Sequence, residues 1–233
     1  MNIKIYADGA DIDQMVAALD NDLIQGFTTN PTLMRKAGIS SYFDFATAVL
    51  SQVQDLPISF EVFSDDFDEM YAQAKKLDAL GSNVFVKIPV TNTRGEFAGD
   101  LIRRLDEEGV KLNITAVFTT QQVSNILRNI NSNTPHIISV FAGRIADTGV
   151  DPIPLMEVAR TLIKQHNANL QLLWASPREV LNVYQANDMK CDIITITPAL
   201  IKKLNLKGKS LSDFSRETVQ MFYDDATASG YTL

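Results

Sequence analysis

The stretch Val84-Phe-Val-Lys-Ile-Pro89 is a short apolar run in which Lys87 is the only polar residue. Its residues do not alternate strictly between apolar and polar, which is typical of a parallel strand covered on both faces. Helical patterns flank it, over Asp65–Leu80 before the run and over Phe97–Glu108 after it. Helix, strand and helix in this order predict a sheet built from repeated strand–helix units.

The same alternation extends along the whole chain. Further helices are predicted over Asp151–His166 and Pro177–Ala186, where apolar residues recur at helical spacing. The predicted strands are Ile3–Asp8, Gly26–Asn30, Ile58–Phe63, Val84–Pro89, Lys111–Val117, Ile137–Gly143, Leu170–Ser176 and Ile193–Pro198. Eight strands separated by helices favour a closed (β/α)8 TIM barrel over an open doubly wound sheet.

The domain organisation follows from the length and the lack of a linker. A chain of 233 residues, without a Pro/Gly-rich or low-complexity break, predicts one barrel domain over residues 1–233. After the eighth strand an additional amphipathic helix is expected over Ser210–Ala226. It either caps the barrel or packs on a neighbouring subunit.

Composition excludes several function classes. The formal net charge of −7 argues against non-specific nucleic-acid binding, which depends on cationic contacts to phosphate. No segment approaches the roughly 20 apolar residues that span a bilayer, so we expect no membrane association. The N-terminus has no signal-peptide pattern, and the single cysteine, Cys191, suits a packing thiol in a reducing cytoplasm. We therefore expect a cytoplasmic protein.

Lys87 is the sharpest chemical feature of the sequence. A lysine inside this apolar strand should lose hydration, which disfavours its charged form and lowers its pKa. A neutral amine can attack a carbonyl and form an iminium ion, an electron sink for carbon–carbon cleavage. The alternative is a structural lysine paired with Glu61 or Asp8. Both interpretations place acids beside it, so these neighbours do not decide between them.

Polar residues gather where the predicted strands end. In a barrel of this kind, chemistry lies at the carboxyl ends of the strands. The residues concerned are Asp8, Asn30, Glu61, Lys87, Asn113, Thr115, Ser139, Arg144, Ser176 and Arg178. Two of them, Asp8 and Glu61, could divide the proton transfers of Schiff-base formation and aldol cleavage. Their structural alternative is charge compensation of Lys87 or helix capping.

Three of these residues suggest an anion site. Arginine forks at Arg144 and Arg178 match phosphate oxygens, and Ser176 adds a donor. Pro177 would suit the first position of a helix whose positive end faces the anion. The alternative is a pair of surface arginines in weak salt bridges.

The sequence contains no recognisable motif for binding a metal or a cofactor. His136 and His166 do not form a metal pattern, and no Cys/His/carboxylate cluster has ligand spacing. There is no Gly-rich phosphate loop and no nucleophile elbow. We expect no cofactor and no metal. Trp174, beside the seventh-strand site, would either line a pocket or pack in the core.

Taken together, the residues resemble the transaldolase family, particularly its small single-domain members related to fructose-6-phosphate aldolase. The resemblance covers nearly the whole chain. The matching pieces are Tyr6-Ala-Asp8, Gly26-Phe-Thr-Thr-Asn-Pro31, Val84-Phe-Val-Lys-Ile-Pro89, Leu112-Asn-Ile-Thr115, Phe141-Ala-Gly-Arg-Ile145 and Trp174-Ala-Ser-Pro-Arg178. Two departures are Gly9, where many relatives carry a small hydroxyl residue, and Pro177, where larger transaldolases often carry Phe.

The resemblance implies a metal-independent Schiff-base mechanism. Lys87 would attack the ketone of fructose 6-phosphate or sedoheptulose 7-phosphate, and Asp8 would take the proton whose loss breaks the C3–C4 bond. The dihydroxyacetone unit would then pass to an aldose phosphate, in the pentose phosphate pathway. The remaining implied roles are water binding by Glu61 and Thr115, sugar binding by Thr28, Asn30, Asn113 and Ser139, and phosphate binding by Arg144, Ser176 and Arg178.

The family has a second branch, fructose-6-phosphate aldolase, which releases free dihydroxyacetone. That branch is expected to carry Gln and Tyr where this chain has Glu61 and Phe141. A phenyl ring cannot hold the water that a tyrosine hydroxyl would hold, so the sequence favours transfer over hydrolysis. A catalytically silent barrel that binds sugar phosphates is the alternative from another class. Small family members form pentameric rings, often stacked as decamers, so the resemblance also implies a homo-oligomer.

Overall fold

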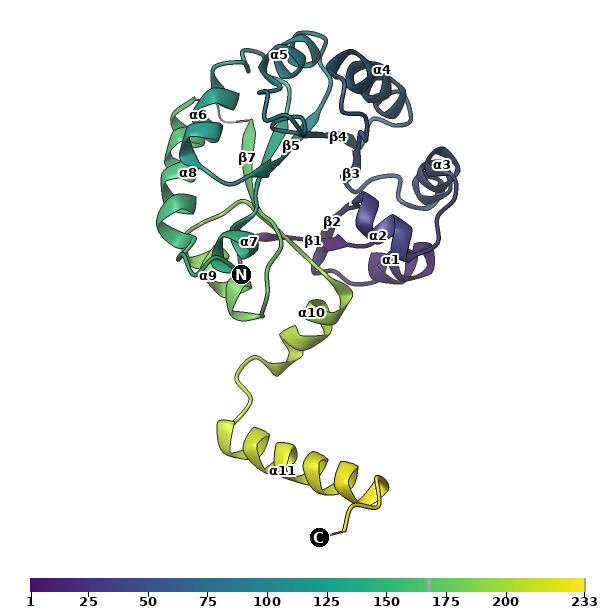
Figure 1. Ribbon diagram of the computed structural model, residues 1–233, viewed down its shortest axis with the longest axis vertical. Coiled ribbons are helices and arrows are strands. Elements are labelled where there is room, and N and C mark those ends of the chain that lie inside the picture. The colour runs from purple at the N-terminus through teal and green to yellow at the C-terminus, as the bar shows by residue number, and fades with distance from the viewer. Residues whose placement is uncertain (167–168, 233) are drawn as a thin grey trace.

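The computed structural model of the protein describes residues 1–166 and 169–232. Its centre is a closed barrel in which eight parallel strands follow one another in chain order (Figure 1). The strands are β1 (Lys4–Asp8), β2 (Ile24–Thr28), β3 (Ile58–Glu61), β4 (Val84–Pro89), β5 (Leu112–Val117), β6 (His136–Val140), β7 (Leu170–Trp174) and β8 (Ile193–Ile196). Because β8 pairs with β1, the sheet has no free edge.

Helices surround this barrel and connect successive strands (Figure 1). The helices between strands are α1 (Ile12–Leu19), α2 (Pro31–Lys36), α3 (Tyr42–Gln52), α4 (Phe67–Asp78), α5 (Gly99–Glu107), α6 (Thr120–Leu127), α7 (Ala142–Ala146), α8 (Ile153–His166) and α9 (Leu181–Asp188). After the last strand come α10 (Pro198–Lys203), the 3-10 turn η1 (Leu204–Leu206) and α11 (Leu211–Ala228). The predicted (β/α)8 TIM barrel with an additional C-terminal helix is therefore confirmed.

Local sequence explains where the helices begin. The Asp66 carboxylate accepts from the amides of Asp68 and Glu69 at 3.0 Å, satisfying donors that the first turn of α4 leaves open. At the start of α6, Thr119 and Gln122 form a capping box. Each such cap stabilises its helix by about 1 kcal/mol and fixes the strand-to-helix turn above the barrel.

Several predicted boundaries were wrong by a few residues, and three of them concern the predicted site. The second strand ends at Thr28 rather than Asn30, because the Asn30 side chain accepts from the Leu33 amide and caps α2. The sixth strand ends at Val140, and the chain turns at once into α7. The helix predicted from Pro177 begins at Leu181 instead.

The hydrophobic core has two parts. A small cluster fills the barrel itself and consists of Tyr6, Phe85, Ile137, Leu173, Ala175 and Ile193. A larger cluster lies between the barrel wall and the helices, where fully buried side chains such as Ile88 and Ile114 each contribute about 1.5–3 kcal/mol. Gly26 leaves room for the Tyr6 ring inside the barrel, since a Cβ at this position would lie 2.6 Å from that ring.

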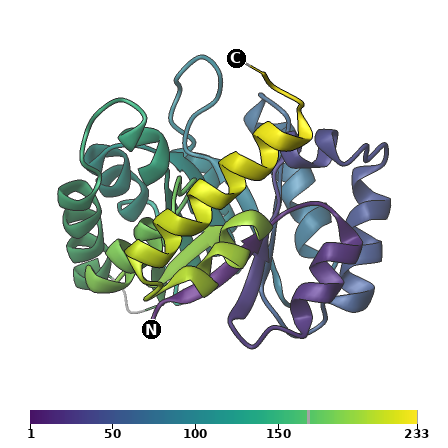
Figure 2. The same cartoon turned by 90° about the horizontal axis from the view of Figure 1, so that it is seen from below.

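The last helix stands apart from the barrel. Figure 1 shows α11 beyond α10 and outside the ring of helices, whereas in the view of Figure 2 it crosses in front of the barrel; none of its residues is buried. Leu211, Val219 and Phe222 expose 84%, 64% and 62% of their surface. Over the described residues, neither α11 nor any other helix combines the length and apolarity needed to cross a membrane.

Candidate active site

The register of the parallel strands explains how the central side chains meet. Glu61 on β3 is level with Lys87 on β4, and Lys87 is level with Asn113 on β5. Side chains at equivalent positions of neighbouring strands project to the same face. Here that face is the interior, near the carboxyl ends of the strands.

A cavity of about 490 Å³ opens at these strand ends. Every residue that the sequence analysis assigned to the site lines it: Asp8, Thr28, Asn30, Glu61, Lys87, Asn113, Thr115, Ser139, Phe141, Arg144, Ser176 and Arg178. The structure therefore brings the predicted residues together in one place. Their individual chemical roles stay predictions.

Lys87 is buried at the floor of this cavity, with 7% of its surface exposed. Its Nζ lies 3.1 Å from Glu61 Oε2 and donates to the Thr29 carbonyl at 2.8 Å. A buried charge is costly unless it is paired and hydrogen-bonded, and both conditions are met here. The Lys87–Glu61 pair was expected under the structural and the catalytic interpretation alike.

Tyr42 fixes the position of Glu61 from outside the barrel wall. The Glu61 amide donates to the Tyr42 hydroxyl at 2.6 Å, and the Tyr42 ring packs against Phe60 and Phe63. Sequence reasoning missed Tyr42, because it lies on α3 and its contact with β3 has no local pattern.

Asp8 lies at the end of β1 beside two threonines. Thr28 Oγ1 donates to Asp8 Oδ1 at 2.7 Å, and Thr28 Oγ1 is 2.5 Å from Thr195 Oγ1. Desolvation raises the pKa of Asp8 above its ordinary value; the nearby Lys87 charge and the Thr28 hydrogen bond oppose this rise. A carboxylate with a raised pKa is a stronger proton acceptor than one in water.

Asn113, which is level with Lys87, belongs to a hydrogen-bonded row of side chains. Asn113 Nδ2 donates to Ser59 Oγ at 3.0 Å, and Ser139 Oγ donates to Asn113 Oδ1 at 2.6 Å. All three residues are buried. These bonds fix the orientation of the Asn113 amide, which borders the cavity.

Thr115 offers an open hydrogen-bonding position. Its Oγ1 is buried and, within the described part of the chain, has no hydrogen-bond partner. The next residue, Ala116, has φ of 58°, a left-handed conformation that is uncommon for a residue with a side chain. Unsatisfied polar atoms and strained backbone are more common at functional sites than elsewhere.

The predicted anion site differs in detail from the prediction. Ser176 has φ of 58°, and no helix begins at Pro177, so the expected helix-end contribution is wrong. The Arg178 guanidinium binds the Asp147 carboxylate, with Nε to Oδ1 at 2.8 Å. Asp147 was not foreseen, because it follows the short α7. The Arg144 guanidinium instead lies 5.5 Å from the centre of the Phe141 ring.

Gly143 allows the two halves of this anion site to approach. Its amide donates to the Ala175 carbonyl at 3.2 Å. A Cβ at this position would lie 1.5 Å from the carbonyl oxygen of Ser176. Only glycine permits α7 and the chain after β7 to pass this closely.

Several other residues bear on the sequence interpretation. Lys36, at the end of α2, and Thr195, on β8, line the cavity although the sequence did not assign them. Trp174 is fully buried in the outer core and does not line it. His136 is buried and pairs with Asp106, with Nε2 2.8 Å from Oδ1. Among the described residues no cluster of His, Cys, Asp and Glu is placed to hold a metal ion.

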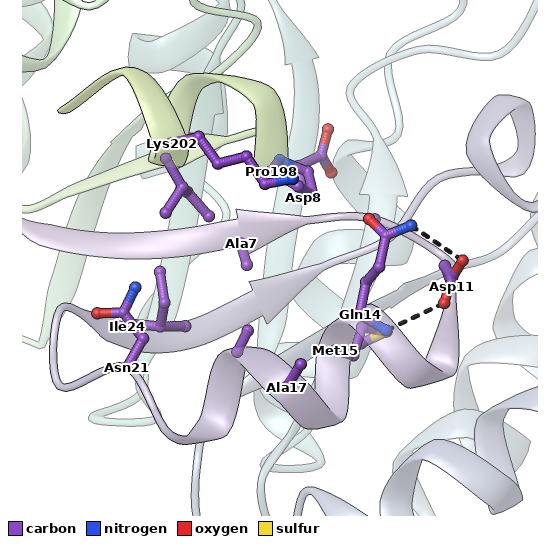
Figure 3. A pocket seen from close by; sticks show the side chains of 13 residues that line it. Ala7, Asp8, Asp11, Gln14, Met15, Ala17, Asn21, Ile24, Pro198 and Lys202 are labelled. Carbon is purple, nitrogen blue, oxygen red and sulfur yellow. Dashed lines mark hydrogen bonds between the residues drawn. The ribbon is translucent and has the colours of Figure 1, made fainter. Parts of the chain in front are cut away.

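A second cavity, of about 530 Å³, lies outside the barrel wall between α1 and α10. Figure 3 shows Asp8 near the end of β1 with Pro198 and Lys202 beside it, while Asp11 is bonded to Gln14. Its lining is mostly apolar and does not include Lys87. The chemically equipped cavity is therefore the one inside the strand ends.

The family model and the relatives that match this sequence agree on one family. The family model described as Transaldolase/Fructose-6-phosphate aldolase matches residues 5–232. A protein named "Probable transaldolase" from Thermoplasma volcanium is 34% identical over 204 residues, covering 87% of each chain. Another of the same name from Bdellovibrio bacteriovorus is 31% identical and covers 96% of this chain and 97% of its own.

Similar solved structures support the fold alone. A putative phosphonomutase from Burkholderia cenocepacia superposes with a TM-score of 0.58 at 10% identity, covering 92% of this chain and 94% of its own. A dihydrodipicolinate synthase from Rhodopseudomonas palustris gives 0.56 at 14% identity, covering 96% and 79%.

Proposed function

The chain belongs to the transaldolase/fructose-6-phosphate aldolase family, and from that premise we propose that it is a Schiff-base-forming transaldolase of the pentose phosphate pathway. It transfers a dihydroxyacetone unit from fructose 6-phosphate or sedoheptulose 7-phosphate to an aldose phosphate. The observation that carries the proposal is the buried Lys87 amine, 3.1 Å from Glu61, on the floor of a cavity that Asp8 also lines.

The first half of the reaction forms the Schiff base. The neutral Lys87 amine adds to the C2 carbonyl of the ketose, and the resulting hydroxyl takes up a proton and leaves as water, which gives an iminium ion. In this proposal Glu61, paired with Lys87, and the Thr115 hydroxyl, unpartnered among the described residues, hold the water through which these protons move.

The second half breaks and remakes a carbon–carbon bond. Asp8 takes the proton of the C4 hydroxyl, C4 becomes the aldehyde carbon, and the C3–C4 electron pair moves into the iminium to give an enamine. The aldose phosphate leaves. The enamine then attacks an incoming aldehyde, Asp8 returns its proton to the new hydroxyl, and hydrolysis frees Lys87. The raised pKa of Asp8 suits both directions of this transfer.

Phosphate recognition is assigned to the rim of the cavity. Arg144 and Ser176 offer donors from α7 and the chain after β7. The Arg178 guanidinium already forms an ion pair with Asp147. It therefore contributes a positive charge at a fixed position and not a bidentate hydrogen bond to the phosphate.

Transfer is favoured over hydrolysis by the surroundings of Phe141. Its ring lies 5.7 Å from the Phe118 ring, and Arg144 covers it at 5.5 Å. The Phe141 ring itself offers no hydrogen bond to a water that would hydrolyse the three-carbon intermediate. The intermediate therefore persists until an aldehyde arrives.

The test is incubation with fructose 6-phosphate, with and without erythrose 4-phosphate. We expect product formation to depend on the acceptor, with little free dihydroxyacetone in its absence. Rapid release of dihydroxyacetone without acceptor would identify a fructose-6-phosphate aldolase instead. Binding of fructose 6-phosphate with no turnover under either condition would leave a sugar-phosphate-binding barrel.

A homo-oligomer held together by α11 is part of the proposal. This helix has no buried residue, and its apolar side chains Leu211, Val219 and Phe222 are mostly exposed. Burial against a second copy would remove this surface from water. Light scattering of the full chain is expected to give a multiple of 25.8 kDa; a mass of one chain would contradict this part.

A further inference from the structure

Thr195 extends the polar network of Asp8 by one residue. Thr28 Oγ1 is 2.7 Å from Asp8 Oδ1 and 2.5 Å from Thr195 Oγ1. The three residues come from the adjacent strands β2, β1 and β8, and all of them line the cavity. Thr28 and Thr195 expose only 3% and 7% of their surface. Buried hydroxyl groups need hydrogen-bond partners, and these two supply one to each other.

The direction of these hydrogen bonds depends on the charge of Asp8. An ionised carboxylate can only accept, so Thr28 must give its single proton to Asp8. The contact between the two threonines then requires Thr195 to be the donor. When Asp8 carries a proton, it can donate to Thr28 instead, and the Thr28 proton can turn toward Thr195. Only the ionised state of Asp8 therefore fixes both hydroxyls in a single arrangement.

We propose that Thr195 is a positioning residue for the transaldolase reaction, acting through Thr28 to hold its hydroxyl as a donor to the Asp8 carboxylate. The inference rests on the proposed function, in which Asp8 accepts the C4 hydroxyl proton. Without Thr195, the Thr28 hydroxyl loses the donor that orients it. Asp8 then loses part of the stabilisation of its charged form.

Other charged groups around Asp8 also influence its pKa. Desolvation raises the pKa of Asp8, Lys87 on β4 and the Thr28 hydrogen bond lower it, and Glu61 on β3 raises it. The other charged side chains of the two cavities that Asp8 borders are Asp11, Lys36, Arg144, Arg178 and Lys202. Substitution of Thr195 leaves all of these charges in place. A change in the pH dependence of activity is therefore due to the hydrogen bonds of Thr28 and Thr195.

Thr195→Val removes the hydroxyl and keeps the branched shape, whereas Thr195→Ser keeps the hydroxyl and removes a methyl group. We expect Val to lower kcat by roughly 2- to 10-fold, the effect of one ordinary hydrogen bond. The acid limb of kcat/KM should move to higher pH by roughly 0.3–1 unit, because the carboxylate is less stabilised. Ser should restore both quantities. Equal losses in Val and Ser without a pH shift would show a packing role and overturn the inference.

A second comparison tests whether Thr195 acts through Thr28. In the Thr28→Val background, Thr195→Val should leave kcat unchanged, since the hydroxyl it would orient is already absent. A further full loss of kcat would contradict the proposal.

Borohydride trapping separates this inference from the proposed function. The wild type and Thr195→Val should both trap substrate, because Thr195 does not touch the Schiff-base amine. No adduct in the wild type would defeat the proposed function. Adducts in both, with identical kcat and pH profiles, would defeat only the role of Thr195.

Discussion

Gly143 offers a sharp test of how the fold positions the anion site. A Cβ atom there would lie 1.5 Å from the Ser176 carbonyl oxygen, whereas non-bonded heavy atoms normally rest about 3.5 Å apart. Gly143→Ala therefore requires α7 and the chain after β7 to separate by about 2 Å. The obstruction is backbone, which cannot rotate away as a flexible side chain would.

The cost can be worked out from these contacts. Overpacking costs about 1–3 kcal/mol, and loss of the Gly143-to-Ala175 hydrogen bond adds about 1 kcal/mol. The better helix propensity of alanine offsets up to about 1 kcal/mol. We expect the free energy of unfolding to fall by about 1–4 kcal/mol. Displacement of Ser176 should also raise KM for fructose 6-phosphate by roughly 10-fold or more, the loss of one charge-assisted hydrogen bond.

Urea unfolding and steady-state kinetics of the same preparation measure both effects. Gly9→Ala is the matched control, because a Cβ at Gly9 has no atom within 4 Å. It should change the free energy of unfolding by less than about 0.5 kcal/mol. Wild-type stability and wild-type KM in Gly143→Ala would show that the close approach at Gly143 does not position Ser176.

Three further predictions follow from individual side chains. Since burial raises the pKa of Asp8 from 3.8, activity should fall as the pH drops through a value above 3.8; a pH–rate profile with its acid limb at or below that value would count against Asp8 as the base. Phe141→Tyr should increase acceptor-independent release of dihydroxyacetone by roughly 10-fold, through one new hydrogen bond to water, and Phe141→Leu should not. Desolvation lowers the pKa of His136 below 6.5 in the folded protein, so its stabilising contribution is complete above that value and is lost as the pH falls below it. The difference in unfolding free energy between the wild type and His136→Gln should be more favourable to the wild type at pH 7.5 than at pH 5.5, and a constant difference would contradict this.

The barrel and most of the site could be predicted because both follow from short-range patterns. Apolar runs without alternation identify parallel strands, and the carboxyl ends of such strands converge in a barrel. Lys87 and Glu61 stand out because charged residues are unusual in these runs. Their meeting across β3 and β4 then follows from register alone.

The parts that were missed depend on tertiary contacts. Thr195 sits in the run Ile193–Ile196, where a threonine has ordinary strand propensity and gives no sign of its contact with Thr28. Tyr42 on α3 contacts Glu61, and Asp147 just after α7 contacts Arg178, at sequence distances that no local pattern connects. Pro177 suggested a helix start, but Ser176 adopts a left-handed conformation and the helix begins later.

The central claim is that Lys87 forms the covalent intermediate. Reduction with borohydride in the presence of fructose 6-phosphate, followed by peptide mass spectrometry, tests it directly. We expect a substrate-derived adduct on Lys87 and none in Lys87→Met. An adduct on another lysine, or turnover in the wild type with no adduct at all, would contradict it.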